Sequence, residues 1–191
     1  MKRTIIPHNA KLVPAEAECV FKGTIYSVYQ WQQEMYDGTF ETFEMLKRPD
    51  TVKVLIIKDG KIVVSHEHQP HVGEFRDIPG GRHDHENETE LDAAKREVLE
   101  ETGFVCKHWK LIHAQQSHGK IEQFLYIFLA WDVLEQRQQQ LDAGEKIEVE
   151  LYTLQDFKSL SKQKNNRSSS MTLLNDVHSI EKLLALPAYS S

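Results

Sequence analysis

Residues 80–104 constrain what this chain can fold into more than any other stretch, and they read GGRHDHENETELDAAKREVLEETGF. Leu91, Ala94 and Val98 recur at helical spacing, so the second half of the stretch predicts an amphipathic helix with one apolar face. Gly103 stands where a helix typically ends in the left-handed conformation. The stretch therefore predicts a glycine turn followed by a helix.

The start of this helix carries its own signals. Asn87 can cap the first turn, with Glu90 three residues later as its capping-box partner. Asp92 and Arg96 are spaced to form an ion pair between successive turns. These features predict a stable helix, and they do not yet assign it a function.

Ordinary helix formation does not explain Glu97, Glu100 and Glu101. Residues three and four apart on a helix lie about 5–6 Å from each other, so Glu97 faces both of the others and their like charges repel. A solvated acidic face of the helix is one explanation. A bound divalent cation is the other, since carboxylate oxygens suit the hard ions Mg²⁺ and Mn²⁺.

The flanking residues favour the cation, because the stretch resembles the sequence motif of the Nudix hydrolase family. That motif runs glycine, five residues, glutamate, seven residues, Arg-Glu, an aliphatic residue, any residue, Glu-Glu, any residue, glycine and an aliphatic residue. The residues that fall on it are Glu88, Arg96, Glu97, Val98, Glu100, Glu101, Gly103 and Phe104. The front departs from the motif, since six residues rather than five separate Gly81 from Glu88.

The resemblance implies an α/β fold, the Nudix alpha/beta/alpha sandwich, in which a mixed sheet lies between helical layers, with a small N-terminal β-sheet region in addition. Three segments are expected on this basis. Residues 1–48 form an N-terminal arm and a β-sheet used for dimerisation, and residues 49–160 form the catalytic domain. Residues 161–191 form a linker and a C-terminal helix packed on that domain.

Local patterns fill in these segments. They predict a hairpin at 20–46 with its turn at 36–39 and a second hairpin at 52–65 with its turn at 59–60. Strands are expected at 108–116, at 124–133 and from Lys146. A linker at 161–170 and an amphipathic helix at 171–186 should follow. The N-terminal strands are too few to be stable alone, so they must pack on the main body or on a second subunit. In the branch of the family that acts on nucleotide sugars and ADP-ribose, such a sheet builds a dimer, so a homodimer is expected.

The resemblance also implies roles for single residues. Glu97, Glu100 and Glu101 are expected to hold the metal, Arg96 to pair with a motif glutamate and orient it, and Glu88 to support the site from behind. In relatives, the carbonyl of the residue that matches Gly80 is a further metal ligand.

The loop before the strand at Lys146 supplies another candidate. In this branch of the family, an acidic residue from such a loop approaches the metals as a general base or a further ligand. Glu145 is the first candidate for that role and Asp142 the second. Plain solvated loop carboxylates are the alternative for both.

The expected substrate contacts are Arg76, Arg82, Tyr29, Trp31 and His118. The two arginines are candidates for phosphate, because the arginine-rich run that relatives carry nearby reads His-Glu-His-Gln here, at 66–69. The two aromatic residues can stack on a base or belong to a cross-strand core. ADP-ribose hydrolases of the family carry a proline where His118 stands, so its absence disfavours ADP-ribose as the preferred substrate without excluding it.

Composition narrows the partners and the location. The chain of 191 residues has a net charge of −6, which argues against broad binding to nucleic acid. Its two cysteines, Cys19 and Cys106, have no metal-binding spacing, so reduced thiols are expected. No signal-peptide core or membrane-spanning apolar run is evident, so a soluble, cytoplasmic protein is expected. Five histidines between residues 66 and 85 repeat no zinc-ligand spacing, and they are expected to face solvent or substrate.

These expectations combine into one reaction on a small molecule: metal-dependent hydrolysis of the diphosphate bond in a nucleotide sugar or ADP-ribose, giving a nucleoside monophosphate and a sugar phosphate. The expected cofactor is Mg²⁺ or Mn²⁺, which neutralises the diphosphate and can generate hydroxide. Two alternatives stay open. One is a catalytically weak sensor of a nucleotide ligand on a Nudix fold, and the other is a structural protein whose acidic helix is a solvated face.

Overall fold

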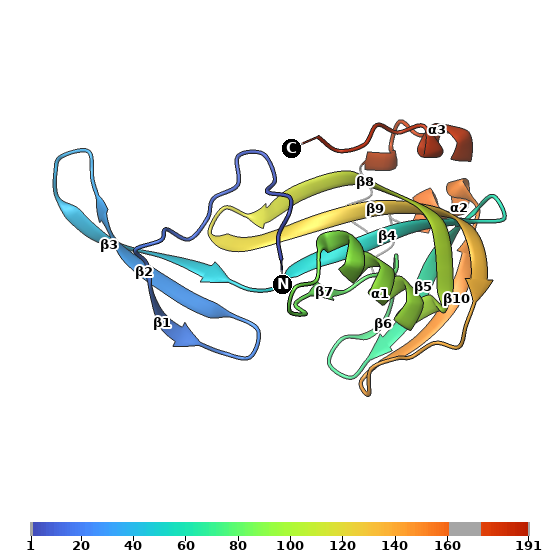
Figure 1. Ribbon diagram of the computed structural model, residues 1–191, viewed down its shortest axis with the longest axis horizontal. Coiled ribbons are helices and arrows are strands. Elements are labelled where there is room, and N and C mark those ends of the chain that lie inside the picture. The colour runs from blue at the N-terminus through green and yellow to red at the C-terminus, as the bar shows by residue number, and fades with distance from the viewer. Residues whose placement is uncertain (1, 161–172, 191) are drawn as a thin grey trace.

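Ten strands in one mixed sheet and three helices form the described part of the chain, residues 2–160 and 173–190 of a computed structural model. The strands are β1 (Glu18–Lys22), β2 (Ser27–Glu34), β3 (Phe40–Lys47), β4 (Asp50–Lys58), β5 (Lys61–Gln69), β6 (Gly73–Asp77), β7 (Arg82–His83), β8 (Phe104–His118), β9 (Ile121–Gln136) and β10 (Lys146–Tyr152). The helices are α1 (Glu90–Thr102), α2 (Leu154–Leu160) and α3 (Ile180–Leu184). The strands pair in the order β1-β2-β3-β9-β4-β5-β10, with β6 beside β5, β7 beside β4 and β8 beside β9 (Figure 1).

Strand β4 lies at the centre of this sheet and shows how its two faces are covered. Its residues point to opposite faces in turn, as the two-residue period of a strand requires. Val52, Val54 and Ile56 belong to the buried cluster that contains Ala94 and Val98 of α1. Leu55 and Ile57 belong to a second cluster, whose members near α2 and α3 are Phe157, Leu160, Leu174, Val177 and Leu183.

Helices therefore cover both faces of a mixed sheet, in which β4 and β9 run parallel from Thr51–Leu125 to Ile57–Trp131. The predicted alpha/beta/alpha sandwich is confirmed. The strands predicted at 108–116, at 124–133 and from Lys146 are β8, β9 and β10.

Both predicted hairpins are present. The turn between β2 and β3 is closed by a hydrogen bond of 2.7 Å from the Met35 amide to the Thr39 carbonyl. The turn between β4 and β5 has positive φ at Asp59 (51°) and Gly60 (72°), which suits a two-residue hairpin turn.

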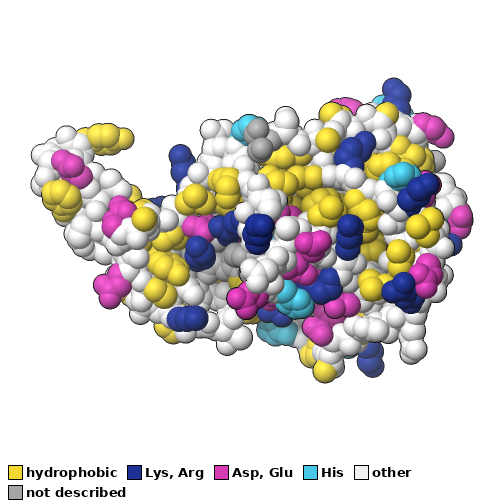
Figure 2. All heavy atoms as spheres, viewed as in Figure 1, with side chains coloured by type: hydrophobic (Ala, Val, Ile, Leu, Met, Phe, Trp, Pro, Cys, Tyr) yellow, Lys and Arg dark blue, Asp and Glu magenta, His cyan; other side chains and the backbone are white. Residues whose placement is uncertain are grey.

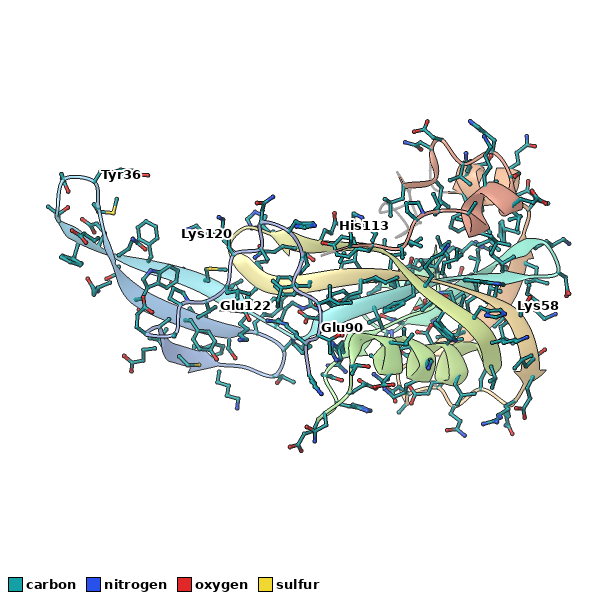
Figure 3. All side chains as sticks on the ribbon, turned by 45° about the horizontal axis from the view of Figure 1, so that its top comes forward. Tyr36, Lys58, Glu90, His113, Lys120 and Glu122 are labelled. Carbon is teal, nitrogen blue, oxygen red and sulfur yellow. The ribbon has the colours of Figure 1, made fainter. Side chains whose placement is uncertain are left out.

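The N-terminal strands form an extension that stands away from the main body (Figure 1). Strand β3 joins the main sheet only through the pairs Leu46–Ile121 and Lys47–Glu122 of the β3–β9 ladder. Tyr36 lies at the tip of the hairpin (Figure 3), and Figure 2 shows hydrophobic side chains on the surface of the extension. Its exposed apolar residues are Val20, Phe21, Ile25, Tyr26, Tyr36 and Phe40.

The predicted start of α1 was wrong by two residues. Thr89 is the N-cap, and it forms a capping box with Asp92 in which each side chain accepts a hydrogen bond from the other residue's backbone amide. Asn87 instead has φ 61° and turns the longer loop towards the helix. Because Asp92 is bound to Thr89, the expected pair between Asp92 and Arg96 does not form. The C-terminal prediction is confirmed, since Gly103 caps α1 with φ 73°.

The predicted closing helix is shorter than expected. Only Ile180–Leu184 form α3, because Ser179 starts a new helix by accepting a hydrogen bond from the Lys182 amide. The apolar residues before it, Leu174 and Val177, are buried as predicted. The linker expected at 161–170 lies outside the described residues. No helix within residues 2–160 and 173–190 combines the length and apolar character needed to cross a membrane.

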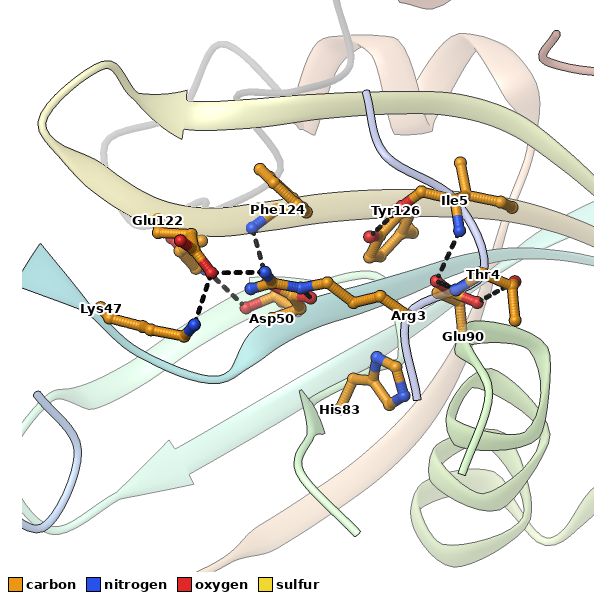
Figure 4. Close-up of polar contacts among 12 residues, drawn as sticks. Arg3, Thr4, Ile5, Lys47, Asp50, His83, Glu90, Glu122, Phe124 and Tyr126 are labelled. Atoms are coloured by element: carbon orange, nitrogen blue, oxygen red, sulfur yellow. Dashed lines mark hydrogen bonds and ion pairs between the residues drawn. The ribbon is translucent and has the colours of Figure 1, made fainter. Parts of the chain in front are cut away.

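Helix α2 and the docking of the first residues were not predicted. Thr153 starts α2 as its cap, with the Asp156 amide donating to Thr153 Oγ1 at 3.1 Å. Residues 2–5, expected to be a lead-in arm, lie against the main body (Figure 4). The amides of Thr4 and Ile5 donate to Glu90 Oε1 at 2.6 and 3.0 Å, at the first residue of α1.

Candidate active site

One cavity of about 470 Å³ gathers most of the predicted catalytic residues. It lies between α1, the strands β4 to β7 and the loop before β10. Its acidic lining residues are Glu67, Asp77, Asp84, Glu97, Glu100, Glu101, Asp142 and Glu145, and its lysines and arginines are Arg48, Lys53, Arg82 and Arg96. Among the described residues that line it, eight carboxylates thus face four basic side chains, and the cavity has a surplus of negative charge.

Arg96 connects the carboxylates of α1 to each other. Its Nε donates to Glu88 at 2.8 Å, and its Nη1 donates to Glu97 at 2.8 Å and to Glu100 at 3.0 Å. Its Nη2 donates to the Arg82 carbonyl at 2.8 Å, which ties the helix to the glycine turn. The planar guanidinium can make these contacts at once because its five donors are fixed in a fork.

The glycine turn packs directly on the carboxylates of the helix. The Gly80 amide donates to Glu101 Oε2 at 2.8 Å, and the Gly80 carbonyl accepts from Lys53 Nζ at 3.1 Å. A Cβ on Gly80 would stand 2.2 Å from the Val52 carbonyl oxygen, and a Cβ on Gly81 would stand 2.6 Å from Glu97 Oε2. Neither position accepts a side chain without displacing the backbone or the site.

Comparison with known proteins agrees with this geometry. The family model described as NUDIX domain matches residues 47–174, which include the whole cavity. The chain belongs to the Nudix family. It is 34% identical over 144 residues to the ADP-ribose pyrophosphatase of Bacillus subtilis (strain 168), covering 73% of this chain and 77% of that relative. A crystal structure of an ADP compounds hydrolase superposes with a TM-score of 0.66 at 18% identity, covering 89% of both chains, and supports the fold.

Membership of the Nudix family confirms two predictions. The chain is a Nudix pyrophosphohydrolase, and it lies in the branch of the family that includes ADP-ribose pyrophosphatase. Nudix hydrolases generally use divalent metal ions.

The donor chemistry of this Nudix cavity fits a divalent cation. Burial raises the pKa of Glu97, where it outweighs Arg96, and of Glu101, where it outweighs Lys53. Burial and then Asp142 raise the pKa of Glu145. The protein's own cations therefore do not fully compensate these carboxylates, and a hard dication would.

The carboxylates would have to reorient in order to bind it. No three Asp, Glu, His or Cys side chains in the described part of the chain are already arranged to hold a metal ion. Arg96 holds one oxygen each of Glu97 and Glu100, and the Gly80 amide holds one of Glu101. Each of these carboxylates keeps a second oxygen for a metal.

The cavity includes several of the other predicted residues. Arg82, Glu145 and Asp142 all line it, and the Glu145 amide donates to the Asp142 carbonyl at 2.9 Å. The two acidic residues thus come from one turn that faces α1. Gly80 also lines the cavity, although its carbonyl is engaged by Lys53.

Arg76 does not reach this site. Its neighbours in β6, Phe75 and Asp77, line the cavity, so the alternation of the strand turns Arg76 to the other face. There its Nε and Nη2 donate to the Glu150 carboxylate at 2.8 and 3.0 Å. Arg76 therefore does not line this cavity, and its phosphate contact stays a prediction.

The remaining predicted substrate residues lie outside the cavity. Tyr29 and Trp31 belong to β2 in the N-terminal extension, where Trp31 packs on Phe43 with ring centroids 6.0 Å apart. His118 ends β8 and lines a separate groove with Phe43 and Lys120. A single chain therefore does not bring these three residues to the carboxylates.

Several residues that line the cavity were not predicted. Lys53, Glu67 and Asp77 are within it, and Lys53 Nζ lies 2.8 Å from Asp77 Oδ2. Burial acts to lower the pKa of Lys53, but Asp77, Glu101 and Glu67 together raise it. The available sequence signal was Lys53 inside the apolar run of β4, which is rare unless the charge is paired.

Proposed function

We propose that the chain hydrolyses the diphosphate bond of ADP-ribose or a related nucleotide sugar in a reaction that depends on Mg²⁺ or Mn²⁺. The products are a nucleoside monophosphate and a sugar phosphate. The observation that carries the proposal is the meeting of Glu97, Glu100 and Glu101 with the Gly80–Gly81 turn in one acidic cavity. The relative from Bacillus subtilis, an ADP-ribose pyrophosphatase, supports the substrate class.

Each side chain has a part in this proposal. Bound dications supply neutralisation of the diphosphate and a hydroxide near neutral pH. Glu97, Glu100 and Glu101 hold the cations, while Arg96 orients two of these glutamates through its hydrogen bonds. Glu145 accepts the proton of the attacking water, with Asp142 as the alternative acceptor in the same turn.

The basic residues at the cavity are candidates for the phosphates. Arg82 is half exposed and holds only a loose pair with Asp84, at 3.6 Å, so its guanidinium is available to a ligand. Arg48 lines the same cavity, and its buried Nε has no hydrogen-bond partner among the described residues. An arginine with an unused donor beside a carboxylate-rich cavity suits a phosphate oxygen of a metal-bound diphosphate.

A substrate panel tests the proposal. The purified chain is incubated with ADP-ribose, ADP-glucose and GDP-mannose, each with Mg²⁺ or Mn²⁺, and release of AMP or GMP is measured. We expect metal-dependent release from at least one compound, with the missing proline at His118 favouring a nucleotide sugar and the Bacillus relative favouring ADP-ribose. Tight binding of a compound without product release would instead support a sensor.

We also propose that the active form is a homodimer built through β1–β3. The exposed apolar residues of this extension, among them Phe21 and Phe40, support an interface between two copies. A partner copy would also explain Tyr29 and Trp31 as substrate contacts, because they lie outside the cavity of their own chain.

A cytoplasmic location completes the proposal, and it is supported by Cys19 and Cys106, which are both free thiols.

A further inference from the structure

Lys53 places a fixed positive charge at the inner end of the cavity. It stands in β4 between the buried residues Val52 and Val54, and its side chain is 18% exposed. Its Nζ lies 2.8 Å from Asp77 Oδ2 and 3.1 Å from the carbonyl oxygens of both Ile78 and Gly80. An ammonium group has three donors, so these three acceptors satisfy it and hold it in one position.

Three buried carboxylates act on this ammonium, one of them in direct contact. Glu67, Asp77 and Glu101 are only 4%, 6% and 6% exposed, and all three interact electrostatically with Lys53. Lys53 is thus a positive charge that three buried acids share. The outer carboxylates, Glu97 and Glu100, are bound instead by Arg96.

The backbone of Gly80 is held between Glu101 and Lys53. Its amide donates to Glu101 and its carbonyl accepts from Lys53. Since a Cβ on Gly80 would collide with Val52, the peptide is also fixed against the backbone of β4. The carbonyl that family resemblance assigns to a metal ion therefore already faces a cation that belongs to the chain.

We propose that Lys53 is a positioning residue that serves as a built-in cation. It occupies the inner position beside the Gly80 carbonyl, and the divalent ions bind only further out, at Glu97, Glu100 and the free oxygen of Glu101. A dication beside the Gly80 carbonyl would be repelled by the nearby ammonium. The inference rests on the proposed metal-dependent reaction and adds that this chain binds one ion fewer than its carboxylates could hold.

Counting bound Mn²⁺ tests the inference without measuring turnover. Binding of Mn²⁺ to the full chain is titrated by electron paramagnetic resonance for the wild type, Lys53→Met and Lys53→Arg. We expect Lys53→Met to bind one additional Mn²⁺ per chain, and Lys53→Arg to bind the same number as the wild type. An unchanged number in Lys53→Met overturns the inference even if the ions bind more tightly, since any nearby charge would change the affinity.

Two further variants keep the test decisive. Lys53→Met leaves the buried Asp77 without its partner and can fail to fold, so the double variant Lys53→Met/Asp77→Asn removes both charges together and is expected to gain the same ion. Lys58→Met is the matched control, because Lys58 lies in the same strand but pairs with the exposed Asp59. A wild type that binds no Mn²⁺ would defeat the proposed function as well, whereas equal ion numbers in the wild type and the variants would defeat the inference alone.

Discussion

Arg3 and Asp50 form a two-point ion pair across 47 residues of sequence, with distances of 2.6 Å from Nε to Oδ2 and 2.9 Å from Nη2 to Oδ1 (Figure 4). Asp50 is completely buried at the first residue of β4. Arg3 also donates to the buried Glu122 at 2.6 Å and stacks over the Phe124 ring, 4.5 Å from its centroid. The first residues of the chain thus neutralise two acids of the core.

We predict that Arg3→Met destabilises the fold by about 3–5 kcal/mol, because it leaves the buried Asp50 without its charged partner, while Glu122 keeps its ion pair with Lys47. The free energy of unfolding, measured by urea denaturation, checks this. Lys11→Met is the control, since Lys11 is exposed and only its backbone amide and carbonyl make hydrogen bonds. Equal stability of the two variants would show that the docked N-terminal residues contribute nothing to the fold.

Removal of one motif carboxylate should abolish most of the activity and leave the fold intact. Glu101→Gln keeps the size of the side chain and loses its charge, so we expect metal-dependent turnover to fall at least about 100-fold. Mn²⁺ affinity and product release measured together check this. Glu86→Gln, in the exposed loop before α1 and outside the cavity, should behave as the wild type. Full turnover in Glu101→Gln would rule out the assigned role.

Arg96 should be irreplaceable by lysine. Its guanidinium contacts Glu88, Glu97, Glu100 and the Arg82 carbonyl, and a lysine ammonium cannot span these acceptors. We expect Arg96→Lys to lose about 10- to 100-fold in metal affinity or activity, the usual cost of losing a residue that orients metal ligands. Lys95→Met, on the exposed side of the same helix, is the control. Wild-type kinetics in Arg96→Lys would show that charge alone is sufficient.

Metal binding should strengthen as the pH rises. Burial raises the pKa of Glu97, Glu101 and Glu145, and a metal ion binds only their ionised forms. Between the ordinary glutamate pKa and these raised values, the folded metal-free chain holds more protons than the unfolded chain, so its stability falls as the pH rises through that window. Calorimetry of Mn²⁺ binding in buffers of different ionisation enthalpy should detect proton release. An affinity that is constant across the window would contradict this prediction.

Local sequence patterns were sufficient for most of the fold and for the helix of the site. The apolar spacing of α1, its capping by Gly103 and the hairpin turn at Asp59-Gly60 all depend on residues near in sequence, and all are confirmed. The start of α1 was misassigned because two adjacent capping boxes compete there, and the longer loop lets Thr89 rather than Asn87 cap the helix.

Contacts between distant segments were the part that local patterns could not supply. Arg3 finds its partners at Asp50 and Glu122, and Lys53 finds Asp77, none of which local spacing relates. Arg76 was proposed as a phosphate contact because relatives carry an arginine-rich run nearby, but strand alternation places it on the opposite face from the cavity. Lys53, inside the apolar run of β4, is the one of these residues that the sequence marks as needing a distant partner.

The N-terminal extension should hold two copies of the chain together. Phe21 and Phe40 are 58% and 60% exposed on strands whose ladder with the main sheet is limited to Leu46 and Lys47, so a second copy of the chain is the expected cover. We predict that Phe21→Ser/Phe40→Ser converts a dimer to a monomer in light scattering coupled to size-exclusion chromatography. Leu134→Ser, 65% exposed on β9, should leave the dimer unchanged.

If substrate contacts come from the partner's Tyr29 and Trp31, the monomeric variant should also show a raised KM with Mn²⁺ affinity unchanged, since the carboxylates lie within one chain. A wild type that is monomeric at all concentrations would refute the dimer, and an unchanged KM in the monomeric variant would remove the aromatic residues from the substrate site.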